Sequence, residues 1–203
     1  GRMLMSKYNI YKNISPNIFR GYDIRAVYGQ DLNEDIAYTI GLSFGSYIIE
    51  KGYKKCVVGH DNRVSSEPLA DALLTGITST GVDIVYLGLC TTPMYYYAQK
   101  KLKIDPGIMI TASHNPKEYN GFKIAFDDFG NACGQMIQDF RVYTEEGKLL
   151  GKVDDIYNTG ANDIYVIKDE LGKQVLLPGI KDVIKNVDLE GGKITVHLIP
   201  GLI

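Results

Sequence analysis

Short apolar runs alternate with longer amphipathic segments over the first 126 residues of the chain. The runs at 56–59, 82–87 and 108–110 have the length of buried strands. Between them, apolar residues recur three or four positions apart, which predicts helices with one buried face. Such alternation predicts an α/β domain with a mixed, largely parallel sheet between helices.

Capping signals bound three predicted helices. Asn33 precedes the first helix and Gly52 ends it. Ser65 or Ser66 begins the second helix, and Gly81 ends it. The third opens at Thr92–Pro93 and ends in a cluster of lysines near Lys103. The predicted inner faces of the first two helices carry Ile36, Ile40, Phe44, Tyr47, Ile48, Leu69, Leu73 and Ile77, and further strands are predicted at 19–28 and 122–126.

The pattern weakens after Gly147. Residues 147–162 are rich in Gly, Asp and Asn, which predicts a linker. A helix is possible at 171–187, although Pro178–Gly179 interrupts it, and 193–199 predicts a strand. The expected organisation is a mobile N-terminal segment over 1–17, a first domain over 18–150 closed by a helix near 135–143, and a linker with the incomplete start of a second, similar domain over 151–203. We therefore interpret the chain as truncated.

Composition is that of an ordinary globular protein, with 45% hydrophobic and 23% charged residues among 203. A net charge of -2 gives no overall attraction to nucleic acid or to anionic membranes. No run approaches the ~18 apolar residues that cross a bilayer. The cysteines at 56, 90 and 133 lack metal-ligand spacing, so we expect reduced, structural thiols in a soluble cytoplasmic protein.

A polar loop at 111–116 separates two of the predicted strands. Ser113 is its only plausible nucleophile or phosphate carrier, and a serine hydroxyl needs help from a base, a metal or a cationic clamp. Lys123 is better spaced than the adjacent His114 to reach the same cleft, because neighbours on an extended chain point opposite ways. The alternative is a polar turn, in which Ser113 and Asn115 bond to nearby backbone.

Four motifs, in order along the chain, resemble those of the α-D-phosphohexomutase superfamily, the phosphomannomutase/phosphoglucomutase enzymes. They are FRGYDIR at 19–25, VGHDNR at 58–63, GLCTTP at 88–93 and TASHNPKEYNGFKI at 111–124. Four collinear matches are far more specific than any one of them alone.

The resemblance implies a mutase that interconverts hexose 1-phosphate and hexose 6-phosphate, of mannose or glucose, through a phosphoserine and a bisphosphate. Ser113 would carry the phosphoryl group. Lys123 would be the general acid/base, with Arg25 as its electrostatic partner, since a nearby cation makes the ammonium proton easier to lose. His114 would contact the sugar or assist proton transfer.

The resemblance also implies a ligand set. Mg²⁺ would be bound partly by the phosphate on Ser113, with its other ligands in an Asp-Gly-Asp-x-Asp-Arg loop that these residues lack. We therefore expect the chain alone to be nearly inactive. Hexose 1,6-bisphosphate would be the activator or intermediate, hexose phosphate the substrate, and neither nucleic acid nor membrane a partner. Substrate contacts would fall to Tyr22, Arg20, Arg63, Asn115 and Asn120.

Three alternatives remain open at this point. Asp61 and Arg63 could pair with each other and order a loop instead of contacting substrate. The chain could be a non-catalytic sugar-phosphate-binding or interaction module derived from a mutase. A serine hydrolase is disfavoured, because the chain has no G-x-S-x-G turn. His60 is expected to hydrogen-bond at a strand end rather than to bind metal.

Overall fold

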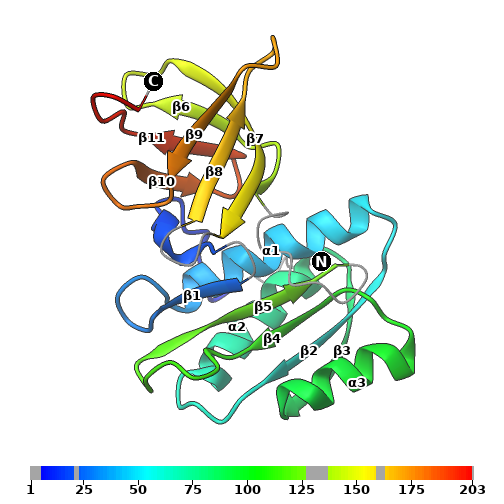
Figure 1. Cartoon of the computed structure of the whole chain (residues 1–203). Coiled ribbons are helices and arrows are strands. Elements are labelled where there is room, and N and C mark those ends of the chain that lie inside the picture. Colours follow the sequence, from blue (N-terminus) through cyan, green and yellow to red (C-terminus); the bar gives the residue numbers. More distant parts are fainter. Residues whose placement is uncertain (1–5, 21–22, 127–136, 159–162, 203) are drawn as a thin grey trace.

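The computed structural model describes residues 6–20, 23–126, 137–158 and 163–202. Its first sheet has the strand order β1-β5-β4-β2-β3 (Figure 1). The strands β2, β3 and β4 are mutually parallel, and β5 is antiparallel to both β4 and β1. This confirms the predicted mixed, largely parallel sheet. The strands are β1 (Asp23–Val27), β2 (Lys55–His60), β3 (Asp83–Leu89), β4 (Gly107–Ile110) and β5 (Tyr119–Ala125).

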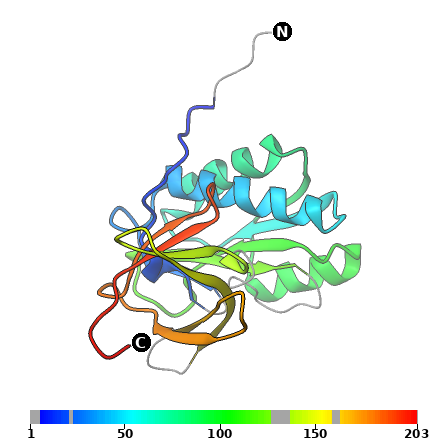
Figure 2. The ribbon, with the colours of Figure 1, turned by 90° about the horizontal axis from the view of Figure 1, so that it is seen from above.

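Helices cover both faces of this sheet, as the hydrophobic periodicity predicted. The helices α1 (Glu34–Glu50) and α2 (Ser66–Ser79) lie on one face, and α3 (Thr92–Leu102) lies on the other (Figures 1 and 2). Of the apolar residues predicted for the inner faces of α1 and α2, all but Tyr47 are at most 2% exposed, and Tyr47 is partly buried. Burial of these side chains is the main force that attaches both helices to the sheet.

Two glycines let α1 and α2 pack in close contact. A Cβ on Gly41 would lie 2.4 Å from the Leu73 carbonyl oxygen, and one on Gly76 would lie 2.2 Å from the Tyr38 carbonyl oxygen. Real Cβ atoms do not approach a backbone oxygen so closely, so side chains at these positions would push the helices apart.

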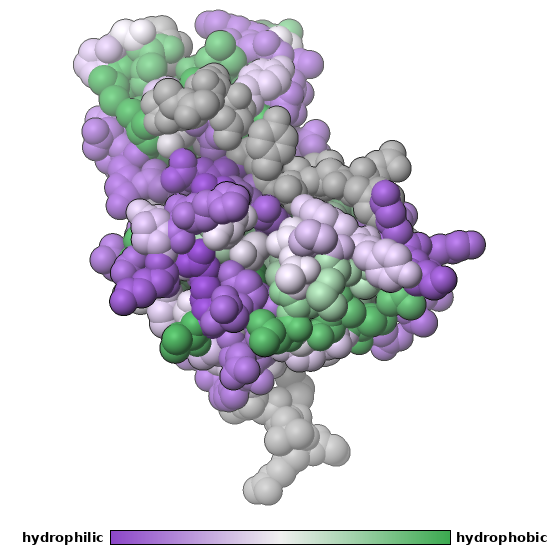
Figure 3. All heavy atoms as spheres, turned by 60° about the horizontal axis from the view of Figure 1, so that its bottom comes forward, coloured by the Kyte–Doolittle hydropathy of each residue, from purple (hydrophilic) through white to green (hydrophobic). Residues whose placement is uncertain are grey.

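The face covered by α3 is less completely closed. The edge strand β3 and α3 expose large apolar side chains, and Figure 3 shows hydrophobic side chains gathered on the face that it brings forward from the bottom of Figure 1. None of the described helices is long and apolar enough to cross a membrane. The exposed apolar residues of β3 and α3 are Tyr86, Leu89, Met94, Tyr97 and Leu102.

Beyond residue 140 the structure is a second, six-stranded sheet with the order β10-β11-β6-β7-β8-β9. Its described residues contain strands and no α-helix, so the prediction of a second α/β domain similar to the first is wrong. The strands are β6 (Arg141–Thr144), β7 (Leu149–Asn158), β8 (Asp163–Lys168), β9 (Gln174–Pro178), β10 (Ile184–Asp188) and β11 (Lys193–Val196).

Three local predictions in this part fail for one physical reason. Residues 149–158, expected in a linker, form β7, and 141–143, expected at the end of a helix, lie in β6. The helix considered at 171–187 is two strands, β9 and β10, separated at Pro178–Gly179. In each case a buried residue, such as Val142, Val153 or Leu177, follows directly after a more exposed one, as in a half-buried strand, but the exposed neighbour of Leu177 is the apolar Leu176. The strand at 193–196 was predicted correctly.

The N-terminal segment joins the two sheets. Ile14 is fully buried and forms an isolated antiparallel bridge with Val187 of β10. The backbone N–H of Tyr11 donates to Thr39 Oγ1 on α1 at 2.8 Å. A short 3-10 helix, η1 (Pro16–Ile18), follows. The expectation of a loose segment over 1–17 is therefore not met near Ile14, which joins a core that both sheets share, whereas Ile10 and Tyr11 are exposed.

Two cysteines lie within the described residues. Cys56 is fully buried in β2, where burial raises the pKa of its thiol to about 12. Cys90 is partly buried, and burial raises its pKa as well. Both thiols therefore stay protonated at neutral pH, in keeping with the predicted structural role; Cys133 lies outside the described residues.

Candidate functional site

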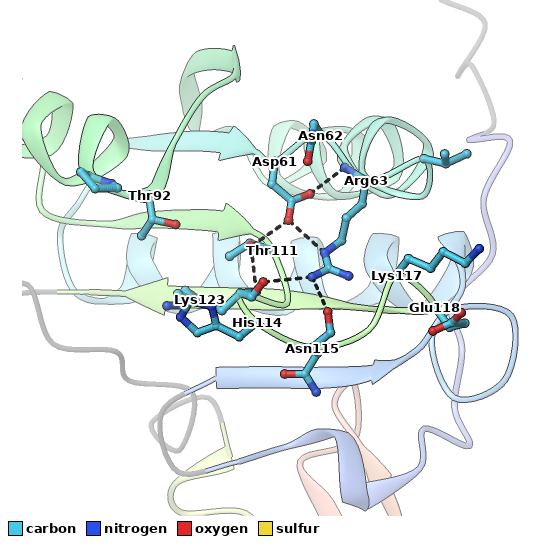
Figure 4. Close-up of a pocket in the computed structure, with 13 residues that line it drawn as sticks. Asp61, Asn62, Arg63, Thr92, Thr111, His114, Asn115, Lys117, Glu118 and Lys123 are labelled. Carbon is cyan, nitrogen blue, oxygen red and sulfur yellow. Dashed lines mark hydrogen bonds and ion pairs between the residues drawn. The ribbon is translucent and has the colours of Figure 1, made fainter.

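A cavity of about 1090 Å³ opens at the carboxyl ends of β2, β3 and β4. Asp61 follows β2, Thr92 lies in the segment after β3, and Thr111 follows β4, while β5 contributes Lys123. Loops that leave neighbouring parallel strands meet at one edge of a sheet. The lining residues are Asp61, Asn62, Arg63, Val64, Thr92, Pro93, Thr111, Ser113, His114, Asn115, Lys117, Glu118 and Lys123 (Figure 4).

Ser113 is exposed at this cavity and has a left-handed backbone, with φ of 52°. That conformation is unfavourable for a residue with a Cβ, so the surrounding contacts must hold it. Its backbone N–H donates to Thr111 Oγ1 at 3.0 Å. Within the described residues the Ser113 hydroxyl has no hydrogen-bond partner, so it is available to a ligand.

Arg63 occupies the centre of the loop that carries Ser113 (Figure 4). Its side chain is 12% exposed, and its Nε donates to Asp61 Oδ2 at 3.1 Å. The two terminal nitrogens donate to four loop carbonyls, those of Pro116 at 2.7 Å, Tyr119 at 3.1 Å, Ser113 at 3.1 Å and Asn115 at 2.9 Å. Because a guanidinium has five N–H donors, these four bonds and the bond from Nε use all of them.

Asp61 lies where these contacts meet. One carboxylate oxygen accepts from Thr111 Oγ1 at 2.8 Å and from Arg63 Nε. The other accepts from Ser66 Oγ at 2.6 Å and from the Arg63 backbone N–H at 3.0 Å. The Asp61–Arg63 pair was expected either to order a loop or to contact substrate, and this geometry supports the ordering of the loop. His60 also behaves as expected at a strand end, with Nδ1 2.7 Å from the Asp61 carbonyl oxygen.

Asn120, a predicted substrate contact, is not among the residues that line the cavity. It is fully buried, and its amide nitrogen donates to Ser65 Oγ at 2.8 Å and Ser66 Oγ at 3.0 Å. Its amide oxygen accepts from the Gly121 N–H at 2.9 Å. The Ser65 hydroxyl makes no capping bond to α2. The amide of Asn120 thus links β5 to the start of α2 by hydrogen bonds.

Lys123 and Arg25 lie on adjacent strands. Lys123 pairs with Asp23 across the β1–β5 ladder, and Arg25 lies two residues along β1, so all three side chains share one face. Arg25 forms an ion pair with Asp23 at 2.6 Å and is not among the residues that line the cavity. The structure therefore brings Lys123, His114 and Asn115 to Ser113, and places Arg25 beside them at the sheet.

Two predicted substrate-binding residues are not part of this cavity as described. Arg20 is exposed and lines a separate cavity of about 250 Å³ with Asp163 and Lys181. Tyr22 lies outside the described residues. Sequence reasoning did not assign a role to Asn62, Thr92, Thr111 or Glu118, although each lies in or beside a matched motif.

Three cationic side chains line the cavity, and they differ in whether a carboxylate offsets their charge. Arg63 is paired with Asp61, whereas Lys117 and Lys123 form no ion pair anywhere in the described ranges. Two such ammonium groups near an exposed hydroxyl suit an anionic ligand. Among the described residues, no group of three His, Cys, Asp or Glu side chains could bind a metal ion.

Fold and site together define an α/β domain that presents a serine loop at the carboxyl ends of parallel strands. The chain belongs to the phosphoglucomutase/phosphomannomutase family: residues 16–145 match the model of its alpha/beta/alpha domain I. The predicted resemblance is confirmed.

Relatives and solved structures agree with this assignment. A phosphomannomutase of Klebsiella pneumoniae is 39% identical over 152 residues, 74% of this chain and 94% of its own length. A phosphoglucomutase of Neisseria gonorrhoeae is 37% identical over 66% of this chain, which spans only 29% of that relative. The crystal structure of a phosphoglucomutase/phosphomannomutase family protein from Burkholderia thailandensis matches 56% of this chain and 26% of its own, with 39% identity and a TM-score of 0.52.

The second sheet has a match of its own. Residues 135–202 match the model of the RimM PRC barrel domain. This match covers the region for which we predicted the start of a second, similar α/β domain and in which the structure has a β-sheet instead.

Proposed function

We propose that this chain carries the phosphoserine step of a hexose phosphate mutase, with Ser113 as the residue that accepts and returns the phosphoryl group. The observation that carries the proposal is the exposed hydroxyl of Ser113, in a cavity that it shares with Lys123 and Lys117. Family membership implies hexose phosphate as substrate. Mannose and glucose phosphates are the proposed substrates.

Each half of the reaction transfers one phosphoryl group. In the first, the bond between phosphorus and Ser113 Oγ breaks and a bond to a free hydroxyl of the hexose phosphate forms, giving a bisphosphate. The sugar hydroxyl loses its proton to a base, and the departing Ser113 Oγ takes up a proton. In the second, Ser113 Oγ loses that proton as it attacks the other phosphate of the bisphosphate, and the sugar oxygen that is released regains a proton. Such transfers depend on positioning and charge stabilisation more than on covalent side-chain chemistry.

Lys123 is the proposed general acid/base. It lines the cavity with Ser113 and has no ion-pair partner within the described residues. Arg25 lies on the same sheet face, but its ion pair with Asp23 offsets much of its charge. Arg25 therefore acts, in this proposal, on the field around Lys123, without contacting the substrate. His114 and Asn115 are proposed to contact the sugar phosphate.

The family implies Mg²⁺, and the described residues do not form a site for it by themselves. No group of three suitable side chains occurs among them, and the Asp61 carboxylate is occupied by Arg63, Thr111 and Ser66. The one ligand that this part of the chain would supply is a phosphate on Ser113. The roles proposed here for Ser113 and Lys123 do not depend on the metal.

Phosphoryl uptake tests the proposal. The chain is incubated with glucose 1,6-bisphosphate and Mg²⁺, and intact mass and peptide mapping follow. We expect one phosphoryl group on Ser113 in the wild type and in Ser79→Ala, an exposed serine on α2, and none in Ser113→Ala. A phosphoryl group on another residue, or binding of bisphosphate without uptake, would favour the non-catalytic binding module.

A further inference from the structure

Arg63 and Asp61 fix the backbone of Ser113 from both sides. The Ser113 N–H donates to Thr111 Oγ1, which donates to Asp61 Oδ2. The Ser113 carbonyl accepts from Arg63, which is paired with the same Asp61 oxygen. Two short chains of hydrogen bonds therefore start at the Ser113 peptide groups and end at one carboxylate.

This frame explains how Ser113 can adopt its unfavourable backbone. A left-handed conformation at a residue with a Cβ persists only where its surroundings determine it. Four carbonyls between Ser113 and Tyr119 point at one guanidinium, so the loop curls around Arg63. The hydroxyl of Ser113 is left exposed toward the cavity while its peptide groups are held.

Arg63 has no donor left for a phosphate. Its five N–H groups are all engaged with the protein, and its charge is offset by Asp61. We infer that Arg63 is a positioning residue that sets the Ser113 loop for phosphoryl transfer, and not the substrate-binding residue that its place in the chain suggested. The inference rests on the proposed function for its catalytic consequence, but not for its effect on the loop.

Arg63→Lys is the informative variant. An ammonium group keeps the charge opposite Asp61 but is a point donor that cannot span four carbonyls. Arg141→Lys is the matched control, because Arg141 is exposed on β6 in the second sheet. Thr111→Val is a second variant that removes the contact to the Ser113 N–H and leaves the Arg63–Asp61 pair intact.

Two measurements on the full chain test the inference. Hydrogen exchange of amides in 111–121 should be faster by about tenfold or more in Arg63→Lys, since several charge-assisted hydrogen bonds are lost. Thr111→Val should speed exchange in the same peptide, and Arg141→Lys should not. The maximal rate of phosphoryl uptake at Ser113 from glucose 1,6-bisphosphate should fall by about tenfold or more in Arg63→Lys, with the half-saturating concentration within about twofold of wild type.

Unchanged exchange in the loop of Arg63→Lys would overturn the inference. So would a raised half-saturating concentration with an unchanged maximal rate, because that result marks a substrate-binding residue. Failure of the wild type to take up a phosphoryl group would instead refute the proposed function, while hydrogen exchange would still decide whether Arg63 holds the loop.

Discussion

At the scale of single residues, the cationic side chains in and beside the cavity are of two kinds, those with a carboxylate partner and those without one. Arg63 and Arg25 each have a carboxylate partner, whereas Lys123 has none in the parts of the chain described. A paired, donor-saturated guanidinium shapes a site, and an unpaired ammonium group can meet a ligand or exchange a proton. Cations that lie in the matched motifs thus have different roles.

Replacing Lys123 tests this division. Lys123→Met keeps most of the side-chain length but has no proton to exchange, so phosphoryl uptake at Ser113 should slow by about 10²–10⁴-fold. Timed intact-mass measurements give the rate, and hydrogen exchange of 111–121 should stay as in the wild type. A rate within about threefold of the wild type would exclude Lys123 as the acid/base, because general acid–base catalysis contributes about 10²–10⁴-fold.

Asn120 should matter for stability instead of binding. Asn120→Ala leaves the buried Ser65 hydroxyl and the Gly121 N–H without their partner, while the Ser66 hydroxyl keeps its bond to Asp61, so we expect a loss of about 1–3 kcal/mol in the free energy of unfolding. Urea denaturation measures it, with the exposed Asn13→Ala as control. Unchanged stability with weaker hexose phosphate binding would restore the substrate-binding role.

At the scale of elements, the α/β part could be predicted well from the sequence. There the period of the apolar residues and the helix-capping residues indicated the same elements. Asn33 caps α1 with its side chain, accepting from the Ile36 N–H at 2.9 Å, and the predicted faces are buried. In the second sheet the apolar positions alternate with Asp, Lys and Gly, which resembles a linker when only composition is considered. Long-range partners such as β6 for β11 decide those strands, and no local signal specifies them.

The roles of site residues were less predictable than their positions. Ser113, His114 and Lys123 could be located from the motifs alone. That Arg63 would be saturated and Asn120 buried depends on how β2, β5 and α2 meet, which is a property of packing. Burial and donor counts cannot be derived from spacing along the chain.

Close packing of α1 on α2 gives a prediction at this scale. Gly41→Ala adds a methyl group 2.4 Å from the Leu73 carbonyl oxygen, which forces the helices apart. The gain in helix propensity is smaller than the overpacking cost, so we expect a net loss of about 1–3 kcal/mol in stability. Thermal unfolding measures it against Ser46→Ala, an exposed site on the same helix. Stabilisation by Gly41→Ala would contradict the observed helix contact.

At the scale of the whole molecule, one α/β domain with the serine loop is joined to a β-sheet of a different kind. Ile14 connects the N-terminal segment to β10, and most buried apolar residues of the two sheets form one core, while Val57, Tyr95 and Met109 form a smaller cluster under α3. The chain spans about 29% of the Neisseria gonorrhoeae phosphoglucomutase that it resembles. Among the described residues, the serine loop has no three-ligand metal group beside it.

Complete turnover should therefore be much slower than in such a relative. Metal stabilisation of the transferring phosphoryl is worth several kcal/mol, so conversion of glucose 1-phosphate to glucose 6-phosphate by the 203-residue chain should be lower by about 100-fold or more. A coupled assay of both proteins at equal concentration measures the ratio. Equal rates would show that this chain forms a full metal and phosphate site.

The most direct test of the central claim follows the phosphoryl group off Ser113. The chain is first phosphorylated at Ser113, freed of donor, and then mixed with glucose 1-phosphate, while ³¹P NMR and intact mass are recorded. We predict that the protein loses its phosphoryl group and that glucose 1,6-bisphosphate appears in equal amount. Release as inorganic phosphate, or a phosphoserine that stays intact in the presence of the sugar phosphate, would contradict a mutase role for Ser113.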